Sequence, residues 1–421
     1  MTMKRRVVIT GLGAVAPNGI GKDAFWEALI RGKSGIREIS RFDASSFPCH
    51  IGGEVNGLDL QNFMDLKLFK RTGRFVHLGI AAALMAAEDA ELDRVKKRES
   101  IGLMVGTSVN ALDVIENGIM ILSEKGLRRL SPFSLLGSLP NAAGGAISIM
   151  LNIKGMSLTI STGCSSAINA IGIGSQMIRE NVQKMVLCVG TDAPITPMAL
   201  AGFCASGMLT EDSCSPEKAS RPFDAKRTGG VLSEGAGAIV LEELSHARKR
   251  NARIYAEVVG FGSTSEAYSM TDLQPDGIEF ARTIRLAIAD GGLHPSEIGY
   301  ISAHAPSDPV SDAVESQAIK QVFGPKLSYR IPISSIKSMI GNPLGAAGIL
   351  QVLASVLTIN TGIVPPTINY EYPDTRCDLD YVPNVARKKE VLTALINSHG
   401  LGASDTTLII RKHRKEGQER K

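Results

Sequence analysis

The stretch LTISTGCSSAINAIGIG, residues 158–174, joins a short β-branched run to a run of small and apolar residues. The first part predicts a strand, Thr162-Gly163 a sharp turn, and the residues from Cys164 onward a helix. A helix N-terminus offers free N–H groups and the positive end of the macrodipole, so we expect it to stabilise a thiolate at Cys164. Taken alone, the position equally suits a cysteine that only packs in a turn. The strand–turn–helix step favours an α/β fold.

The same alternation continues in both directions along the chain. Short β-branched runs predict strands at residues 5–13, 101–108, 157–161, 184–192, 237–244, 254–265, 298–305, 331–337, 393–402 and 406–412. Apolar stripes at helical spacing predict helices at residues 76–91, 165–180, 277–291, 312–323 and 345–360.

The second half weakly repeats the first. VVITGLGAVAPNG near the start and AEVVGFGSTS after residue 254 both resemble a strand that enters a Gly-x-Gly turn. We therefore expect an internally duplicated fold with halves at 1–250 and 251–421. Gly11 and Gly13 do not predict a dinucleotide site, because the third glycine of that motif is Ala16 and Pro17 interrupts the helix that should follow.

Composition excludes several classes of protein. The tail 411–421 holds six Lys/Arg and two Glu, and the other 410 residues hold 40 charges of each sign, so nucleic acid is not an expected partner. The six cysteines have neither CxxC spacing nor a paired framework, which indicates reduced thiols. There is no signal-peptide core and no run of 18 uninterrupted apolar residues. We expect a cytoplasmic protein that does not enter membranes.

Three later stretches change the interpretation of Cys164. YISAHAPSDPVSDAVESQ places His304 after a strand and before a helix. PISSIKSMIGNPLGAAG places Lys337 and Asn342 in a similar setting, and INSHGLGASDTTLII makes a Gly-rich turn around Leu401. Singly, these are ordinary caps and turns. Together with the motif at Cys164 they resemble, over essentially the whole chain, the β-ketoacyl-acyl carrier protein synthases of the synthase I/II branch.

The resemblance implies a thiolase-like, α-β-α-β-α layered fold and an acyltransferase active site. Cys164 takes the position of the cysteine that accepts an acyl group from acyl carrier protein. His304 takes the position of a histidine that stabilises the malonyl enolate, and Lys337 that of a lysine that shapes the electrostatics. Asn342 stands where the family has its second histidine and still offers an NH₂ donor. The backbone N–H groups of Cys164 and Leu401 correspond to the oxyanion hole.

Other positions depart from the family pattern. Pro306 and Asp308 replace two threonines that contact the phosphopantetheine arm, and Gln351 replaces a glutamate. Gly230 and Leu401 replace phenylalanines, which implies a wider pocket mouth. His399 replaces a further phenylalanine and is either a packing histidine or an added polar group near Cys164.

The resemblance also implies partners. Acyl carrier proteins are acidic, and two basic clusters match the family's docking region: Lys67, Lys70, Arg71 and Arg74, and Lys125, Arg128 and Arg129. A homodimer is expected, with pairing to a second synthase-like chain as the alternative. No metal or cofactor is expected, since the substrates are held on the phosphopantetheine of the carrier.

We therefore predict a 3-oxoacyl-acyl carrier protein synthase that performs a decarboxylative Claisen condensation in fatty acid or polyketide-type biosynthesis. One alternative is a non-elongating acyltransferase or initiating synthase that uses the same Cys164. Another is a non-catalytic partner resembling a chain-length factor, against which the intact Cys164 and His304 argue. Acyl chain length and pathway stay open.

Overall fold

The computed structural model describes residues 5–413, so most of the basic tail, residues 414–421, lies outside the described residues. In the first half the strands are β1 (Val7–Ala16), β2 (Gly19–Ile20), β3 (Arg37–Glu38), β4 (Ile51–Gly52), β5 (Ile101–Gly106), β6 (Ser157–Ile160), β7 (Met185–Asp192) and β8 (Gly235–Glu243). The helices of this half are α1 (Lys22–Ile30), α2 (Leu66–Phe69), α3 (Arg74–Asp89), α4 (Leu112–Lys125), α5 (Ser134–Ser138), α6 (Ala142–Met150), α7 (Ser166–Arg179), α8 (Pro197–Ala205), α9 (Pro216–Ala219) and α10 (Leu244–Lys249).

The second half has fewer elements. Its strands are β9 (Ala256–Ser265), β10 (Tyr300–Ser302), β11 (Ile333–Ser334), β12 (Ile363–Val364), β13 (Arg387–Lys388), β14 (Thr393–Gly400) and β15 (Ser404–Arg411). Its helices are α11 (Ile278–Asp290), α12 (Ser311–Leu327), α13 (Lys337–Ile340) and α14 (Ala347–Thr361). Each strand and helix predicted from the sequence has a counterpart. The elements that were not predicted are the helices α1, α2, α4, α5, α6, α8, α9, α10 and α13 and the two-residue strands β2, β3, β4, β12 and β13.

Strand order shows the internal duplication directly. From β1 outward the first half runs β1-β8-β7-β5-β6, and from β9 outward the second half runs β9-β15-β14-β10-β11. If the five strands of each series are numbered in the order of the chain, both series read 1-5-4-2-3. The pairings match as well, with two antiparallel steps followed by two parallel ones. The halves join where β1 and β9 pair antiparallel.

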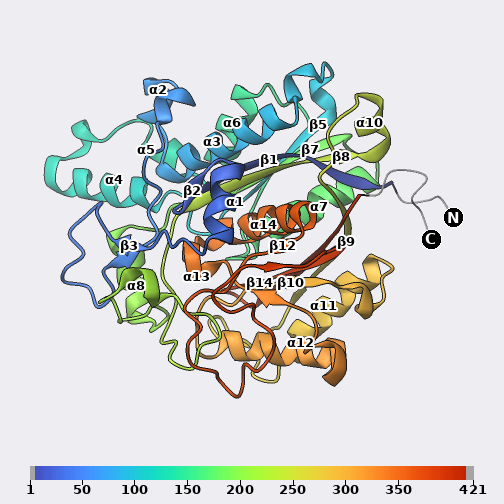
Figure 1. The fold of residues 1–421 in the computed structure, drawn as a ribbon. Helices are drawn as coiled ribbons and strands as arrows, with labels where there is room; N and C mark the ends of the chain where they lie inside the picture. The colour runs from blue at the N-terminus through green and yellow to red at the C-terminus, as the bar shows by residue number, and fades with distance from the viewer. Residues whose placement is uncertain (1–4, 414–421) are drawn as a thin grey trace.

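The helices form layers around the strands, as Figure 1 shows. Helices α3 and α6 cover the outer face of the first half, and α11 and α12 cover that of the second. Helices α7 and α14 lie between the two sets of strands and pack on both. The segment Leu344–Thr361 has the length and hydropathy of a membrane span, yet it lies in this buried central layer. The predicted α-β-α-β-α architecture is confirmed.

The two Gly-x-Gly sequences lie inside strands, so the predicted turns are wrong. Gly11 and Gly13 belong to β1, and an added Cβ would stand 2.3 and 2.1 Å from carbonyl oxygens of α3. Gly260 and Gly262 of β9 meet α11 in the same way, at 2.2 and 2.5 Å. Glycine is required because a helix backbone rests directly on the strand at both equivalent places.

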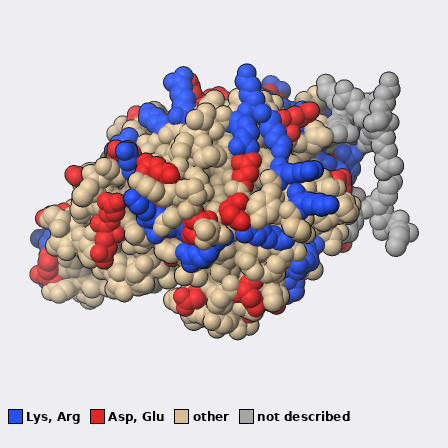
Figure 2. Space-filling model, turned by 60° about the horizontal axis from the view of Figure 1, so that its bottom comes forward, with Lys and Arg blue, Asp and Glu red and all other residues tan. Residues whose placement is uncertain are grey.

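Charged side chains of both signs are interspersed on the face shown in Figure 2. This arrangement agrees with the balanced charge of the chain apart from its tail. It is typical of an ordinary solvated surface rather than of a single-sign field that would attract a polyanion.

Candidate active site

Cys164 lies in the turn between β6 and α7. Gly163 has φ 62°, and an added Cβ there would stand 2.9 Å from the backbone nitrogen of Leu401. This close approach brings the turn after β14 against the cysteine turn, and Ser398 Oγ donates to the carbonyl oxygen of Cys164 at 3.1 Å. The Cys164 side chain is only 5% exposed. Two segments more than 230 residues apart therefore fix its position.

Asn342 faces the cysteine from the turn after α13. Its Nδ2 lies 3.8 Å from Cys164 Sγ, within reach of a hydrogen bond to sulfur. The backbone is held on both sides, since Asn342 N donates to Val231 O at 2.8 Å and Ser233 N donates to Asn342 O at 3.1 Å. Among the described residues, Asn342 Oδ1 has no hydrogen-bond partner. The amide thus presents its donor to the reacting sulfur.

His304 is oriented by Lys337. Lys337 Nζ lies 3.5 Å from His304 Nδ1 and also donates to the carbonyl oxygen of His304. An ammonium group can only donate, so Nδ1 must accept and the ring proton lies on Nε2. His304 therefore offers an N–H donor on its other edge, which suits an enolate oxygen.

Glu315, on α12, was missed by the sequence analysis. It accepts from the backbone N–H groups of His304 and Ala305 at 3.0 and 2.9 Å, and from Asn397 Nδ2 at 3.0 Å. Because the N–H groups of His304 and Ala305 bond to a carboxylate and not to a neighbouring strand, β10 ends before them and is shorter than predicted. Gln351 instead donates to the carbonyl oxygens of Ala303 and Asn397.

Burial sets the protonation of the site. It raises the pKa of the Cys164 thiol, although the charge of Lys337 and the hydrogen bond from Asn342 oppose the shift. The expectation of a stabilised thiolate at Cys164 is therefore not met. Burial, together with Lys337 and His399, holds the pKa of His304 well below its usual value, so the ring is neutral. Burial lowers the pKa of Lys337 to about 8.

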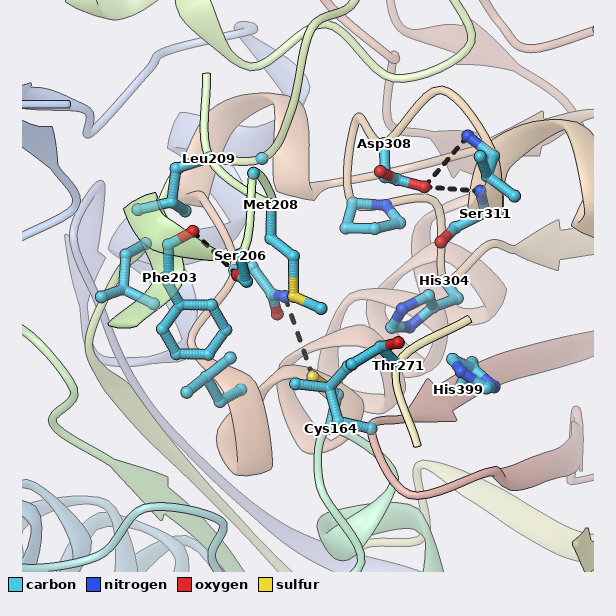
Figure 3. Close-up of a pocket in the computed structure, with 18 of the residues that line it drawn as sticks. Cys164, Phe203, Ser206, Met208, Leu209, Thr271, His304, Asp308, Ser311 and His399 are labelled. Atoms are coloured by element: carbon cyan, nitrogen blue, oxygen red, sulfur yellow. Dashed lines mark hydrogen bonds between the residues drawn. The ribbon is translucent and has the colours of Figure 1, made fainter. Parts of the chain in front are cut away.

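These side chains open into one cavity of about 390 Å³ (Figure 3). Cys164, His304, Asn342, His399 and Leu401 all line it, while Lys337 lies behind His304. Apolar walls come from the following residues: Phe203, Met208, Leu209, Val231, Leu232, Leu273 and Leu344. A mostly apolar cavity with a few converging polar groups suits an acyl thioester.

Gly230 marks a close approach in the cavity wall. An added Cβ would stand 2.9 Å from Pro306 O, so a larger residue would push the 305–308 loop outward. Leu401 is 38% exposed and lines the same cavity. Both positions sit where the sequence analysis expected a widened mouth.

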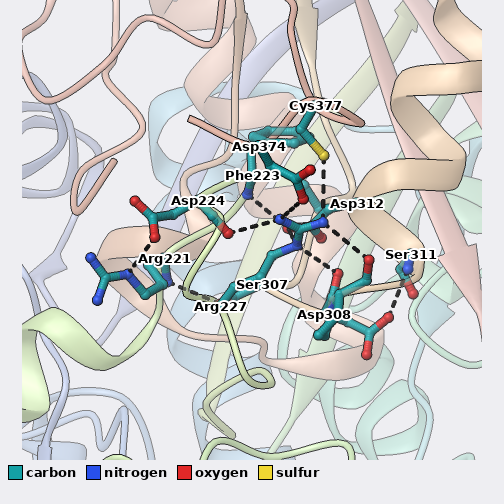
Figure 4. Close-up of polar contacts among 12 residues, drawn as sticks. Arg221, Phe223, Asp224, Arg227, Ser307, Asp308, Ser311, Asp312, Asp374 and Cys377 are labelled. Carbon is teal, nitrogen blue, oxygen red and sulfur yellow. Dashed lines mark hydrogen bonds and ion pairs between the residues drawn. The ribbon is translucent and has the colours of Figure 1, made fainter. Parts of the chain in front are cut away.

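Asp308 stabilises the start of α12 at the edge of the cavity. Its Oδ1 accepts from the backbone N–H groups of Val310 and Ser311 at 3.0 and 2.7 Å, which caps the start of α12. Arg227 binds the same loop, donating to Asp308 O at 3.2 Å and Pro309 O at 3.0 Å (Figure 4). Pro306 and Asp308 thus belong to a tightly fixed loop, and both line the cavity in place of the threonines that the resemblance leads one to expect.

His399 is hydrogen-bonded to a buried carboxyl group. Its Nδ1 lies 2.7 Å from Asp405 Oδ1, and its ring is T-shaped to that of His304, with centroids 6.0 Å apart. Asp405 is fully buried and was not singled out in the sequence, although it is six residues away on the paired strand β15.

Asp192 is a second buried carboxylate that the sequence analysis missed. It accepts from Thr107 Oγ1 and from the backbone N–H groups of residues 108, 109, 110 and 345, at 2.7 to 3.1 Å. It therefore ties the loop after β5 to the turn that follows Asn342.

The predicted docking residues differ in their surroundings. Lys67 on α2 and Lys70 directly after it are exposed, as are Lys125, Arg128 and Arg129 around the end of α4. Arg71 stacks over the ring of Phe133, in the segment that follows the second cluster, at 4.0 Å. Arg74 instead forms a bidentate ion pair with the buried Glu234, at 2.7 and 2.8 Å. Because this internal bond engages its charge, we leave Arg74 out of the docking surface.

The chain is similar to known proteins in both sequence and structure. Residues 4–247 match the family model described as "Beta-ketoacyl synthase, N-terminal domain", and residues 255–371 match "Beta-ketoacyl synthase, C-terminal domain". A protein of Coxiella burnetii named 3-oxoacyl-[acyl-carrier-protein] synthase 2 is 42% identical over 97% of this chain and 99% of its own. A Synechocystis protein of the same name is also 42% identical, with the same coverage.

Solved structures agree with this result. A type II polyketide synthase acyl-carrier protein in complex with its ketosynthase, bound to the hexaketide, has a TM-score of 0.90 at 33% identity, covering 98% of this chain and all of that one. The ishigamide ketosynthase/chain length factor has a TM-score of 0.91 at 33% identity, with the same coverage.

Proposed function

The chain belongs to the β-ketoacyl synthase family, and we propose that it joins an acyl group held on Cys164 to a malonyl thioester, forming a 3-oxoacyl thioester. The observation that carries this proposal is the convergence of Cys164, His304 and Asn342 on one cavity. A nucleophile and two donors are the groups that acyl transfer and enolate stabilisation require.

In the first half-reaction Cys164 Sγ attacks the acyl thioester and the carrier thiol leaves. We assign the oxyanion hole for this step to the backbone N–H groups of Cys164 and Leu401, because the two turns meet at Gly163. The acyl chain then occupies the apolar part of the cavity.

In the second half-reaction the malonyl thioester loses CO₂ and the resulting enolate attacks the acyl carbon. His304 Nε2–H and Asn342 Nδ2–H donate to the enolate oxygen. Lys337 keeps His304 in the donating tautomer by occupying Nδ1. No cofactor enters the scheme, since every reacting group is a protein side chain or a carrier-bound thioester.

The direct test is incubation with acyl- and malonyl-carrier protein, followed by measurement of CO₂ release and of the product mass. We expect both CO₂ and a 3-oxoacyl product. A Cys164 adduct without CO₂ release would instead establish the second candidate function, a non-elongating acyltransferase, which the replacement of a histidine by Asn342 favours.

An acyl carrier protein is the proposed partner, and one solved relative is described as a ketosynthase in complex with such a carrier. The exposed cations Lys67, Lys70, Arg128 and Arg129 offer complementary charge to an acidic surface. Exchanging Arg128 and Arg129 for Glu is expected to raise the KM for carrier-bound substrate roughly tenfold, because repulsion replaces attraction.

The readout for this docking prediction is the rate with carrier-bound and with small-molecule thioesters at several salt concentrations. Rates with the small thioester should not change. The exposed pair Lys96 and Lys97, exchanged for Glu, serves as the charge-matched control. An unchanged KM for the carrier in the Arg128/Arg129 variant would remove this surface as the docking site.

We also propose a homodimer, formed through the edge of the first half. Strand β6 is the terminal strand there, and it carries the exposed apolar side chain of Leu158. Helix α6 packs beside β6, α5 contacts α6, and α4 contacts α5. These helices and the residue before β6 expose further apolar side chains: Ile119, Met120, Leu135, Leu136, Ile149 and Met156. Such an unpaired edge with an apolar surround is typical of an interface. Light scattering should give twice the chain mass, and Ile149→Glu should give one chain mass; a monomeric wild-type protein would argue for a different chain as partner.

The cytoplasm remains the proposed location, on the grounds of the reduced cysteines and of a carrier-bound substrate. The boundary between the two halves near residue 250 likewise stays a prediction.

A further inference from the structure

His399 in the cavity wall and two carboxyl groups behind it, those of Asp405 and Glu266, form a buried acid–base chain. His399 Nδ1 lies 2.7 Å from Asp405 Oδ1, and the candidate ligand or proton-bearing atoms of His399, Asp405 and Glu266 all lie within 4.8 Å of one another. Asp405 is 0% and Glu266 6% exposed. Asp405 Oδ2 and Glu266 Oε1 have no hydrogen-bond partner among the described residues if both carboxyls are ionised. A proton shared between the two carboxyls would satisfy both atoms and remove one of the two buried charges.

The chain connects the cavity to the surface. At one end His399 lines the cavity, and because Nδ1 is bonded to Asp405, the Nε2 edge is the one left for the cavity and for His304 (Figure 3). At the other end Glu266 follows β9 directly, between the exposed residues Ser265 and Ala267. Glu266 is held there by Ala403 O and by Gln274 N, which donates to Oε2 at 2.8 Å.

Decarboxylative condensation consumes one proton in each turnover. The bond from the malonyl methylene carbon to the carboxylate breaks, CO₂ leaves, and the electron pair forms the new carbon–carbon bond to the acyl carbon. The tetrahedral adduct then breaks its C–S bond, with the electron pair going to Cys164 Sγ. Because burial raises the pKa of this thiol, the sulfur leaves far more readily if it takes up a proton as the bond breaks.

The groups nearest to the sulfur are poor sources of that proton. His304 is neutral and its Nε2–H is engaged with the enolate oxygen in the proposed scheme, while its Nδ1 is occupied by Lys337. Lys337 lies behind His304 and does not line the cavity. Asn342 has no acidic proton. The other ionisable side chains that line the cavity are His399, Asp272 and Asp308; Asp308 is engaged at the start of α12, whereas His399 lies beside His304.

We propose that Glu266, Asp405 and His399 form a proton relay that supplies the cavity, through His399 Nε2, with the proton consumed when the acyl group leaves Cys164. Asp405 positions His399 and passes a proton to Nδ1 as Nε2 gives its own proton to the sulfur, and Glu266 reloads Asp405 from the surface. This inference rests on the proposed condensation.

The relay has a defined pH dependence. Burial and the neighbouring Asp405 raise the pKa of Glu266 to about 7, while His399 and the N–H of Gln274 oppose the shift. At the inner end, His399 faces His304, and Lys337 stands behind it. Below pH 7 Glu266 holds a proton that it can pass on, and above pH 7 it does not. The rate of acyl release from Cys164 should therefore fall as the pH rises through about 7.

The test separates acyl loading from condensation. Wild-type protein and the variants His399→Phe, Asp405→Asn and Glu266→Gln are first acylated on Cys164, and complete loading is verified by intact mass. Malonyl-carrier protein is then added, and loss of the adduct is followed in a single turnover between pH 5.5 and 9, in H₂O and D₂O. We expect a rate roughly 100-fold lower in His399→Phe, loss of the solvent isotope effect, and no dependence on pH near 7 in Glu266→Gln.

Asp276→Asn is the matched control, because Asp276 is an exposed acid of the same loop that caps α11 through Ile278 N, and asparagine caps equally well. Thermal unfolding shows whether each variant is folded. Variants that keep the wild-type rate, pH profile and isotope effect would overturn the relay. So would one equivalent of Zn²⁺ or Mn²⁺ in purified protein that Asp405→Asn removes. Failure of wild-type protein to load Cys164 or to release CO₂ would instead refute the proposed function.

Discussion

Replacing Cys164 by alanine is expected to abolish acylation and elongation while leaving the fold and the decarboxylation of malonyl thioester in place. Sγ is the atom that forms the thioester bond, so no other group of the cavity can replace it. The fold should persist because the turn is held by backbone features, namely the φ of 62° at Gly163 and the bond from Ser398 to the carbonyl oxygen of residue 164. Decarboxylation should persist because His304 and Asn342 remain.

Intact mass after incubation with acyl-carrier protein measures the first effect, and CO₂ release from malonyl-carrier protein measures the second. Cys188 offers a matched control: it is fully buried in β7, and burial raises its pKa beyond the ordinary range for thiols. Cys188→Ala should keep both the adduct and elongation. An adduct that forms equally in Cys164→Ala would show that another residue is the nucleophile.

The position of Cys164 could be predicted because all its determinants are local in the sequence. A β-branched run, a glycine and small residues specify strand, turn and helix within 17 residues. The two Gly-x-Gly sequences were recognised as equivalent for the same reason, yet their conformation was predicted wrongly. What decides it is the helix that packs on each strand, α3 on Gly11 and α11 on Gly260, and that contact lies about 25 to 75 residues away.

The parts of the site that could not be predicted are those made by distant carboxylates. Glu315 reaches back to His304 across the turn into α12, and Asp192 joins a loop 82 residues before it to a turn 153 residues after it. The protonation of Cys164 was also mispredicted. A helix N-terminus favours a thiolate, but the structure buries the sulfur, and desolvation is the larger effect. Burial of the sulfur depends on how the two halves pack around the turn, and a local sequence pattern does not specify that packing.

We expect Asn342 to support elongation, because its geometry suits an amide donor. The backbone of this residue is paired with Leu232, so the side chain leaves the turn in one direction only. Nδ2 then lies 3.8 Å from Sγ, and His304 lines the same cavity. An enolate oxygen between the two side chains would receive one N–H from each. The amide needs no particular protonation state to donate, whereas a histidine there would have to be neutral with the proton on the correct nitrogen.

Replacing Asn342 by leucine, which has nearly the same volume and no donor, is therefore expected to lower the rate of CO₂ release about 10²- to 10³-fold, or roughly 3–4 kcal/mol. Acylation of Cys164 should persist, because the oxyanion hole for that step lies in the backbone. Asn342→His should recover most of the lost rate, since a neutral imidazole supplies an N–H in the same direction. The measurement is CO₂ release from malonyl-carrier protein beside adduct formation on Cys164. Leucine and asparagine enzymes that decarboxylate equally fast would show that His304 alone stabilises the enolate.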